Sequence, residues 1–84
     1  MANLGTFTIS TDGYETLASK TGLTFTEGTK YTIQITNDAH LREGTTGEGF
    51  LVDSTVPITY TATSDALYIN TNNSQGSCLV NIAS

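Results

Sequence analysis

The sequence predicts an all-β protein, an antiparallel β-sandwich or jelly-roll-like barrel of about seven or eight short strands. Turn-forming residues recur every 8–12 residues or so, a spacing typical of such folds. Between the turns, apolar and polar residues alternate, as they do in half-buried strands. Threonine is abundant, and its branched β-carbon favours strands over helices. We expect all 84 residues, 1–84, to form a single domain.

The N-terminal part of the chain is expected to begin with a strand. Phe7 and Ile9 alternate there with threonine and serine, so one face of the strand is apolar. Residues 15–20 have the composition of a helical turn, but so short a segment is not stable as an isolated helix.

Residues 23–36 have the pattern of a β-hairpin. Apolar residues alternate with polar ones on both sides of Glu27-Gly28, a dipeptide that favours a turn. The second half, from Lys30 to Thr36, is the clearest strand of the chain, with one apolar and one polar face.

Strand patterns also occupy the second half of the chain, at residues 50–52, 57–61, 67–70 and 78–83. Pro57 has no amide hydrogen to donate, so it should begin its strand or lie on a sheet edge. The last two segments are predicted to form a hairpin across residues 72–76.

The expected core follows from these alternating patterns. It consists of Phe7, Ile9, Leu23, Phe25, Tyr31, Ile33, Ile35, Leu67, Ile69, Val80 and Ile82. Cys78 and Tyr60 are in phase with core residues and are expected to be buried, whereas Tyr68 is out of phase and is expected to be exposed.

The charge balance excludes partners that require a basic surface. The formal net charge is −5, and the only basic residues are Lys20, Lys30 and Arg42. Three scattered cations cannot form the phosphate-binding surface of a nucleic-acid-binding protein, and an anionic membrane is unfavourable for the same reason. Much of the surface must be uncharged, and an uncharged surface costs less to desolvate in a contact between subunits.

Residues for catalysis or for metal binding are nearly absent. His40 and Cys78 are the only histidine and the only cysteine, which excludes a zinc cluster and an internal disulfide. No nucleophile elbow surrounds any serine, and the glycine-rich segment 44–49 lacks the lysine of a phosphate loop. We therefore expect no enzymatic activity, no catalytic residue and no cofactor. A calcium ion that bridges Asp12 with Asp38 or Asp53 is the remaining metal hypothesis.

A resemblance to a known class of protein covers about residues 14–84. It is carried by the hairpin pattern at 22–35 and by four later segments, Gly44-Thr-Thr-Gly-Glu-Gly-Phe-Leu-Val-Asp, Pro57-Ile-Thr-Tyr, Ala66-Leu-Tyr-Ile-Asn-Thr and Cys78-Leu-Val-Asn-Ile-Ala-Ser. In this pattern the chain resembles small β-sandwich structural proteins of tailed bacteriophages. Head decoration proteins, head fibres and tail-associated proteins share this sequence pattern.

The resemblance implies a virion structural protein, made in the bacterial host cytoplasm, that decorates and reinforces the capsid. The absence of a secretory signal and of an apolar run long enough to span a membrane is consistent with that location. The alternative is a tail or baseplate module that binds a host glycan or receptor.

An interface with other virion subunits is expected at the segment that surrounds the glycine-rich loop. Its candidate residues are His40, Arg42, Gly44, Thr45, Thr46, Gly47, Glu48 and Tyr68. A core this small, with no disulfide or metal, should also gain from self-association, so we expect a homo-oligomer, with a trimer as one possibility. We also expect another chain to cover an edge strand or this glycine-rich loop.

Overall fold

A computed structural model describes residues 2–37, 39–45, 49–52, 57–71 and 77–84. They form eight strands and one short helix. In chain order these are β1 (Asn3–Ile9), β2 (Glu15–Thr16), α1 (Leu17–Thr21), β3 (Lys30–Thr36), β4 (Ala39–Glu43), β5 (Phe50–Val52), β6 (Ile58–Thr61), β7 (Leu67–Asn70) and β8 (Cys78–Ala83). The all-β prediction is confirmed.

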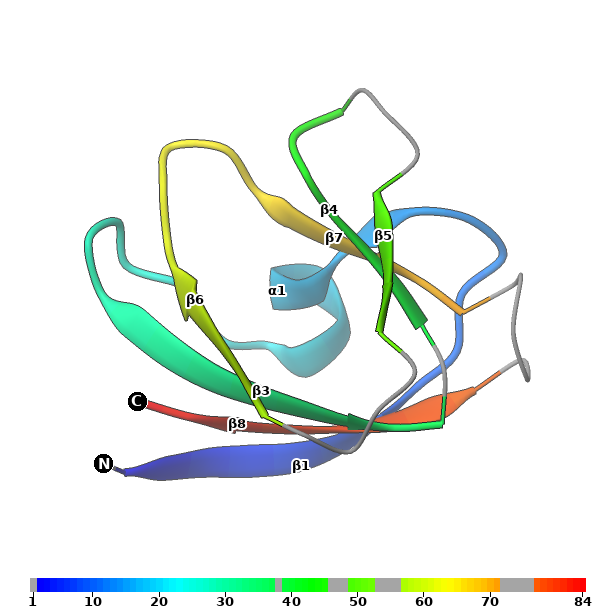
Figure 1. The fold of residues 1–84 in the computed structure, drawn as a ribbon, viewed down its shortest axis with the longest axis horizontal. Helices are drawn as coiled ribbons and strands as arrows, with labels where there is room; N and C mark the ends of the chain where they lie inside the picture. The colour runs from blue at the N-terminus through cyan, green and yellow to red at the C-terminus, as the bar shows by residue number, and fades with distance from the viewer. Residues whose placement is uncertain (1, 38, 46–48, 53–56, 72–76) are drawn as a thin grey trace.

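The strands form two antiparallel sheets of four strands each. The first, sheet A, has the order β1-β8-β3-β6, and the second, sheet B, has the order β2-β7-β4-β5. Figure 1 shows sheet A along the lower part of the molecule and β4, β5 and β7 above it. Both chain ends lie together at one end of sheet A, where the backbones of Ala2 and Ser84 exchange hydrogen bonds.

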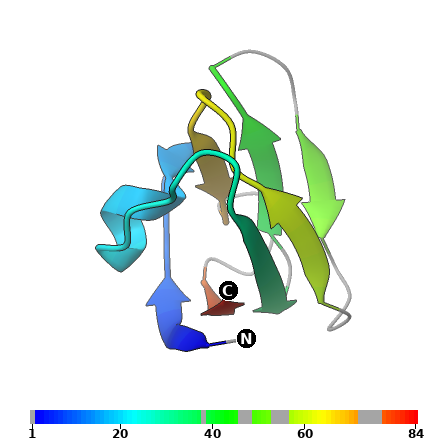
Figure 2. The same ribbon diagram turned by 90° about the vertical axis from the view of Figure 1, so that its left-hand side faces the viewer.

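The pairing has the topology of a jelly roll. β1 pairs with β8, β2 with β7, β3 with β6 and β4 with β5, so the chain behaves as one long hairpin whose two arms wind together. The wound hairpin closes into two sheets because β8 also pairs with β3, and β7 also pairs with β4. Figure 2, from the side, shows the strands arranged around a common interior.

The interior contains the predicted core. Ile9, Tyr31, Ile33, Ile35, Leu67, Ile69, Val80 and Ile82 are buried, and Phe7, Leu23 and Phe25 pack against them while partly exposed. Cys78 is buried as predicted, and Tyr60 is only partly buried. The structure adds the buried residues Leu17, Ala39, Leu41, Val52 and Ala62. Each sheet contributes alternate residues to this interior, as period-two patterning requires.

Two predicted hairpins are wrong. Residues 23–29 form no strand, and the chain enters β3 through an extended segment and a turn in which the amide of Thr29 donates to Thr26. The last two strands do not pair with each other either, because β7 lies in sheet B and β8 in sheet A. Alternation shows that a segment is a strand, but it carries no information on which strand is its neighbour.

The predicted helical turn is a real helix that depends on its surroundings. Thr16 caps the N-terminus of α1 by accepting a hydrogen bond from the amide of Ser19 at 3.4 Å, and Gly22 ends the helix in the left-handed conformation. The helix contacts β1, β2 and β7, so it bridges the two sheets. Its Leu17 is fully buried in the core, which is the packing that stabilises so short a helix.

Pro57 directly precedes β6, an edge strand of sheet A, as predicted. A second edge feature is a bulge in β1 between Asn3 and Gly5, where the pairing with β8 shifts register. Bulges and prolines both disturb an edge as a template for further strand pairing.

A buried pair of threonines joins the segment after β1 to the end of β7. The amide of Thr11 donates to Oγ1 of Thr71 at 2.8 Å, and the amide of Thr71 donates to Oγ1 of Thr11 at 2.9 Å. Both residues are buried, at 5% and 0% exposure, so neither amide has water as an alternative acceptor. The pair links sheet A to sheet B across 60 residues of sequence.

We expect Thr71→Val to lower the free energy of unfolding by about 1–3 kcal/mol, because it leaves the buried amide of Thr11 without its acceptor at nearly constant side-chain volume. Urea denaturation would measure the loss. Thr59→Val, an exposed position on β6, is the control and should change stability by no more than about 0.5 kcal/mol. Equal stability of the two variants would contradict the assigned role of the threonine pair.

Candidate functional site

The outer face of sheet A is made almost entirely of uncharged polar side chains. Its strands place core residues inward, so the alternate residues point to solvent and line up across the sheet in rows. One row joins Thr8, Leu79 and Thr36, and the next joins Thr6, Asn81 and Gln34. The hydroxyl of Thr6 donates to Oδ1 of Asn81 at 3.0 Å, which places both side chains on the same face.

We call this surface the neutral face. Its members are Asn3, Thr6, Thr8, Lys30, Thr32, Gln34, Thr36, Thr59, Thr61, Leu79, Asn81 and Ala83. Lys30 alone carries a charge among these described positions, although the chain has 11 charged residues in all (3 basic and 8 acidic). Leu79 is 44% exposed within it, as one of the few large apolar side chains on the described surface.

The outer face of sheet B brings together three of the predicted interface residues. His40 and Arg42 lie two positions apart on β4 and point outward, and Arg42 is paired in register with Tyr68 on β7. Gly44 and Thr45 follow β4 at the end of the sheet, at the start of the connection to β5. The remaining predicted residues, Thr46, Gly47 and Glu48, lie outside the described part of the chain.

Arg42 is held between two tyrosine rings. Its guanidinium carbon lies 4.0 Å from the ring centre of Tyr14 and 5.3 Å from that of Tyr68, and its Nε donates to the carbonyl of Gly44 at 3.1 Å. Such cation–π contacts orient the arginine and cover the rings. Tyr68 is therefore half-buried rather than exposed, which corrects the sequence prediction.

His40 lies near the start of β4. β4 continues through His40, and the next residue, Leu41, is fully buried in the core. Within the described residues, Nδ1 of His40 is buried and has no hydrogen-bond partner. Opposite it on β5, Leu51 is 48% exposed, so this side of sheet B also presents an apolar group to solvent.

A small polar cluster lies where β4 ends near β6. Oε2 of Glu43 accepts hydrogen bonds from the hydroxyls of Thr63 at 2.7 Å and Tyr60 at 3.3 Å. Burial raises the pKa of the Tyr60 phenol, and the negative charge of Glu43 adds to the effect. None of these residues was predicted as a site, because they are distant in sequence and share no motif.

We expect Glu43→Gln to lower the pKa of Tyr60, because the substitution removes the carboxylate charge that disfavours tyrosinate. An NMR titration of ring-labelled tyrosine would follow the change, with Glu15→Gln as a charge-matched control away from Tyr60. Because the pKa of Tyr60 is raised in the folded protein, the unfolded chain loses the phenolic proton at a lower pH than the folded protein does. The free energy of unfolding should therefore fall as the pH rises above 10.0, the ordinary pKa of tyrosine. An unchanged Tyr60 pKa in Glu43→Gln would refute the electrostatic assignment.

Gly49 is expected to tolerate no side chain. Its φ of +73° is in the left-handed region, and an added Cβ would lie 2.4 Å from the carbonyl oxygen of Leu41 and 2.5 Å from the hydroxyl of Tyr14. Gly49→Ala should therefore cost at least about 1–2 kcal/mol of stability in a denaturation experiment. Gly13→Ala is the matched control, since nothing lies within 4 Å of its added Cβ and its backbone is not left-handed. Comparable stability of the two variants would contradict this geometry.

The described residues show neither a metal cluster nor a membrane-spanning helix. They contain no group of three or more His, Cys, Asp or Glu residues placed to hold a metal ion. The hypothetical calcium ligands Asp38 and Asp53 lie outside the described ranges. In the same part of the chain, no helix has the length and apolar character needed to cross a membrane.

Comparisons with protein-family models, with curated proteins and with solved structures find no match to this chain. Two surfaces of the described chain are therefore the basis for a function: the neutral face of sheet A and the cluster of Arg42 with Tyr14 and Tyr68 on sheet B.

Proposed function

We propose that this chain is a structural protein of a tailed-bacteriophage virion that decorates and reinforces the capsid. The single observation that carries the proposal is the neutral face, a four-stranded surface with one charge in a chain of net charge −5. Charged side chains are depleted at the centre of protein–protein interfaces, because their desolvation is costly. A surface without them is suited to contact with another protein.

The size of the neutral face decides how such a contact would work. Four strands spaced about 4.8 Å apart and about six residues long cover on the order of 400 Å². A stable interface buries about 800 Å² on each partner, so one copy would bind weakly. Repeated contacts on a symmetric shell would raise the total affinity without any stronger single contact. A decoration protein that attaches at many equivalent places fits this requirement.

The sequence pattern and the topology add support of a more general kind. Residues 14–84 resemble small phage structural proteins in pattern, and the jelly-roll topology is used by viral capsid proteins, as well as by lectin domains and cupins. One fold serves many functions, so the topology alone does not select among these. The resemblance and the neutral face together favour the virion.

Self-association, with a trimer as the simplest form on a local three-fold axis, is part of the proposal. The edge strands are β1 and β6 in sheet A and β2 and β5 in sheet B. Lys20, Lys30 and Arg42 lie in α1, β3 and β4, so no edge strand contains a basic residue, and only Lys20 reaches one among the described ion pairs, by pairing with Glu15 of β2 at 3.3 Å. The bulge in β1 and Pro57 before β6 disturb the edges of sheet A, whereas the three residues of β5 contain no bulge, proline or charge, and such an edge is commonly covered by another chain.

Two matched substitutions test which face binds the capsid. Leu79→Glu places a charge in the neutral face, and Leu51→Glu does the same on the outer face of sheet B, where His40, Arg42 and Tyr68 lie. Both leucines are exposed to a similar degree, 44% and 48%, so neither change should unfold the protein. We expect Leu79→Glu to lose at least about tenfold in affinity for virions that lack the protein, and Leu51→Glu to bind normally.

Co-sedimentation with virions purified from a deletion strain would measure this binding. The opposite ranking of the two variants would move the interface to sheet B. Failure of the unsubstituted protein to bind virions, or its absence from purified particles, would refute the proposed function.

Light scattering at micromolar concentration would test self-association. We expect a species larger than the monomer, because the domain has uncovered edges and no covalent staple. A monodisperse monomer of high thermal stability would show that one domain is stable without a partner subunit, and would contradict this expectation.

Recognition of a host glycan is the alternative function. It requires an aromatic platform that is free to stack on a sugar, and on sheet B Arg42 already occupies the faces of Tyr14 and Tyr68. The described contacts therefore favour a protein partner over a sugar at this surface.

A further inference from the structure

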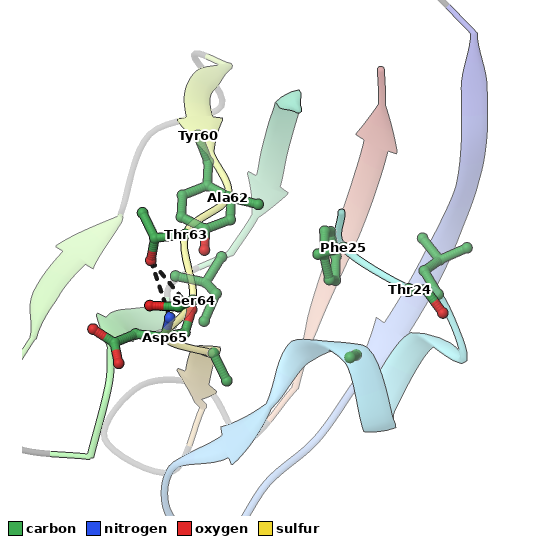
Figure 3. Close-up of a pocket in the computed structure, with 11 residues that line it drawn as sticks. Thr24, Phe25, Tyr60, Ala62, Thr63, Ser64 and Asp65 are labelled. Carbon is green, nitrogen blue, oxygen red and sulfur yellow. Dashed lines mark hydrogen bonds between the residues drawn. The ribbon is translucent and has the colours of Figure 1, made fainter. Parts of the chain in front are cut away.

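A pocket of about 320 Å³ opens at one end of the sandwich, next to α1. Figure 3 shows Phe25 on one side of it, and Tyr60, Ala62, Thr63 and Ser64 on the other. The volume lies at the lower end of the range of small-molecule sites, about 300–1,000 Å³.

The aromatic walls of the pocket are held in place. The ring of Phe25 packs edge-on against Tyr31, with 4.9 Å between ring centres and an angle of 78°. The Tyr31 hydroxyl accepts a hydrogen bond from the amide of Thr26 at 2.7 Å, and the Tyr60 hydroxyl donates to Glu43. Rings that are fixed before a ligand arrives lose little conformational entropy when it binds.

Backbone hydrogen bonds tie the two sides together. The amide of Gly28 donates to the carbonyl of Ala62 at 2.8 Å, and the amide of Ala62 donates to the carbonyl of Thr29 at 3.0 Å. The segment that carries Phe25 is thereby attached to the strand that carries Tyr60. The pocket is part of the folded structure and does not require a rearrangement to form.

The interior of the pocket is mainly apolar. Leu23, Leu67 and three alanines line it together with the two aromatic rings. The side chains of Thr63 and Asp65 point away from Phe25 (Figure 3), and the Thr63 hydroxyl already donates to Glu43 and accepts from the amide of Asp65. A bound molecule would therefore meet apolar side chains at Leu23, Phe25 and Leu67, and polar groups along the segment 63–65.

The rim of the pocket is negative. Asp65 lines it, and Glu43 lies beside Tyr60, whereas none of the lining residues is basic. The Asp65 carboxylate forms no hydrogen bond or ion pair with another described residue. Burial is the main cause of the raised pKa of Tyr60, and the negative charges of Glu43 and Asp65 add to it.

We propose that this pocket binds a small organic cation, with an apolar body between Phe25 and Tyr60 and its positive charge at the rim beside Asp65 and Glu43. The proposal goes beyond capsid attachment and does not depend on it. An anion would be repelled by the two carboxylates. A neutral sugar would place hydroxyl groups against Leu23, Phe25 and Leu67, where they find no hydrogen-bond partners.

The test uses three probes of nearly equal size that differ in charge. Phenethylammonium, phenethyl alcohol and phenylacetate would each be titrated into the ¹⁵N-labelled full chain at millimolar concentration, with amide shifts as the readout. We expect shifts at residues 23–25 and 62–67, and binding of the ammonium roughly tenfold tighter than that of the alcohol, with phenylacetate weakest. Methyl glucoside serves as the neutral-sugar comparison and should cause no shifts there.

Variants separate the contribution of charge from that of shape. Asp65→Asn should reduce the ratio of the ammonium affinity to the alcohol affinity by at least about twofold. Asp12 is an exposed carboxylate beyond the opposite end of β7, so Asp12→Asn should leave this ratio unchanged. Ala66→Leu adds volume from an exposed rim position without disturbing the core, and should weaken the ammonium and the alcohol alike.

Equal affinity for the ammonium and the alcohol would overturn the proposal, as would binding that Ala66→Leu leaves intact. Absence of shifts at the pocket with every probe would also overturn it. Shifts caused by methyl glucoside but not by phenethylammonium would replace the cation with a sugar. None of these results bears on the capsid assay, which probes a different surface.

Discussion

The fold depends on the position of β8. The last strand lies between β1 and β3, so sheet A is not complete until residues 78–83 pair with both arms of the chain. Its inward residues, Cys78, Val80 and Ile82, are almost fully buried and form the centre of the core. Because most contacts of such a topology are distant in sequence, closing the chain costs loop entropy before burial compensates for it. The alternation in β8 has to be strict for this reason, and it is.

The same strand explains why the neutral face exists. An inward position on this strand requires an apolar residue. An outward position needs only a residue that fits a pleated sheet. The uncharged residues threonine, asparagine and leucine occupy most of the outward positions of this sheet. Among the other described residues, charges lie in α1, between strands and on sheet B, where Arg42 is shielded by Tyr14 and Tyr68. The two outer faces thus differ in chemistry although they share one core. A protein with a single attachment side requires such a difference.

Much of the fold could be predicted from the sequence, and little of the site. Period-two patterns and a short apolar run identified six of the eight strands and most of the core, because burial on one face of a pleated strand acts on each segment separately. The partners of those strands were mispredicted at the 72–76 connection, because two alternating segments look alike whether they pair or cross between sheets. β4 was overlooked because its buried residues, Ala39 and Leu41, flank a histidine in a polar stretch. The Glu43–Tyr60–Thr63 cluster has no local signal at all, since only the register of the sheets brings it together.

The two ends of the sandwich solve the problem of a small core differently. At one end of β7, Thr11 and Thr71 satisfy each other's buried amides and seal the interior with polar groups. At the other end, beside Leu67, the chain places alanines where larger side chains would fill the space, and a pocket remains. A pocket that is open to water leaves apolar walls hydrated, so the free energy of burying them is not gained. A domain with so small a core has a low free energy of unfolding, and an open pocket lowers it further. A bound ligand therefore explains a pocket with a charged rim better than imperfect packing does.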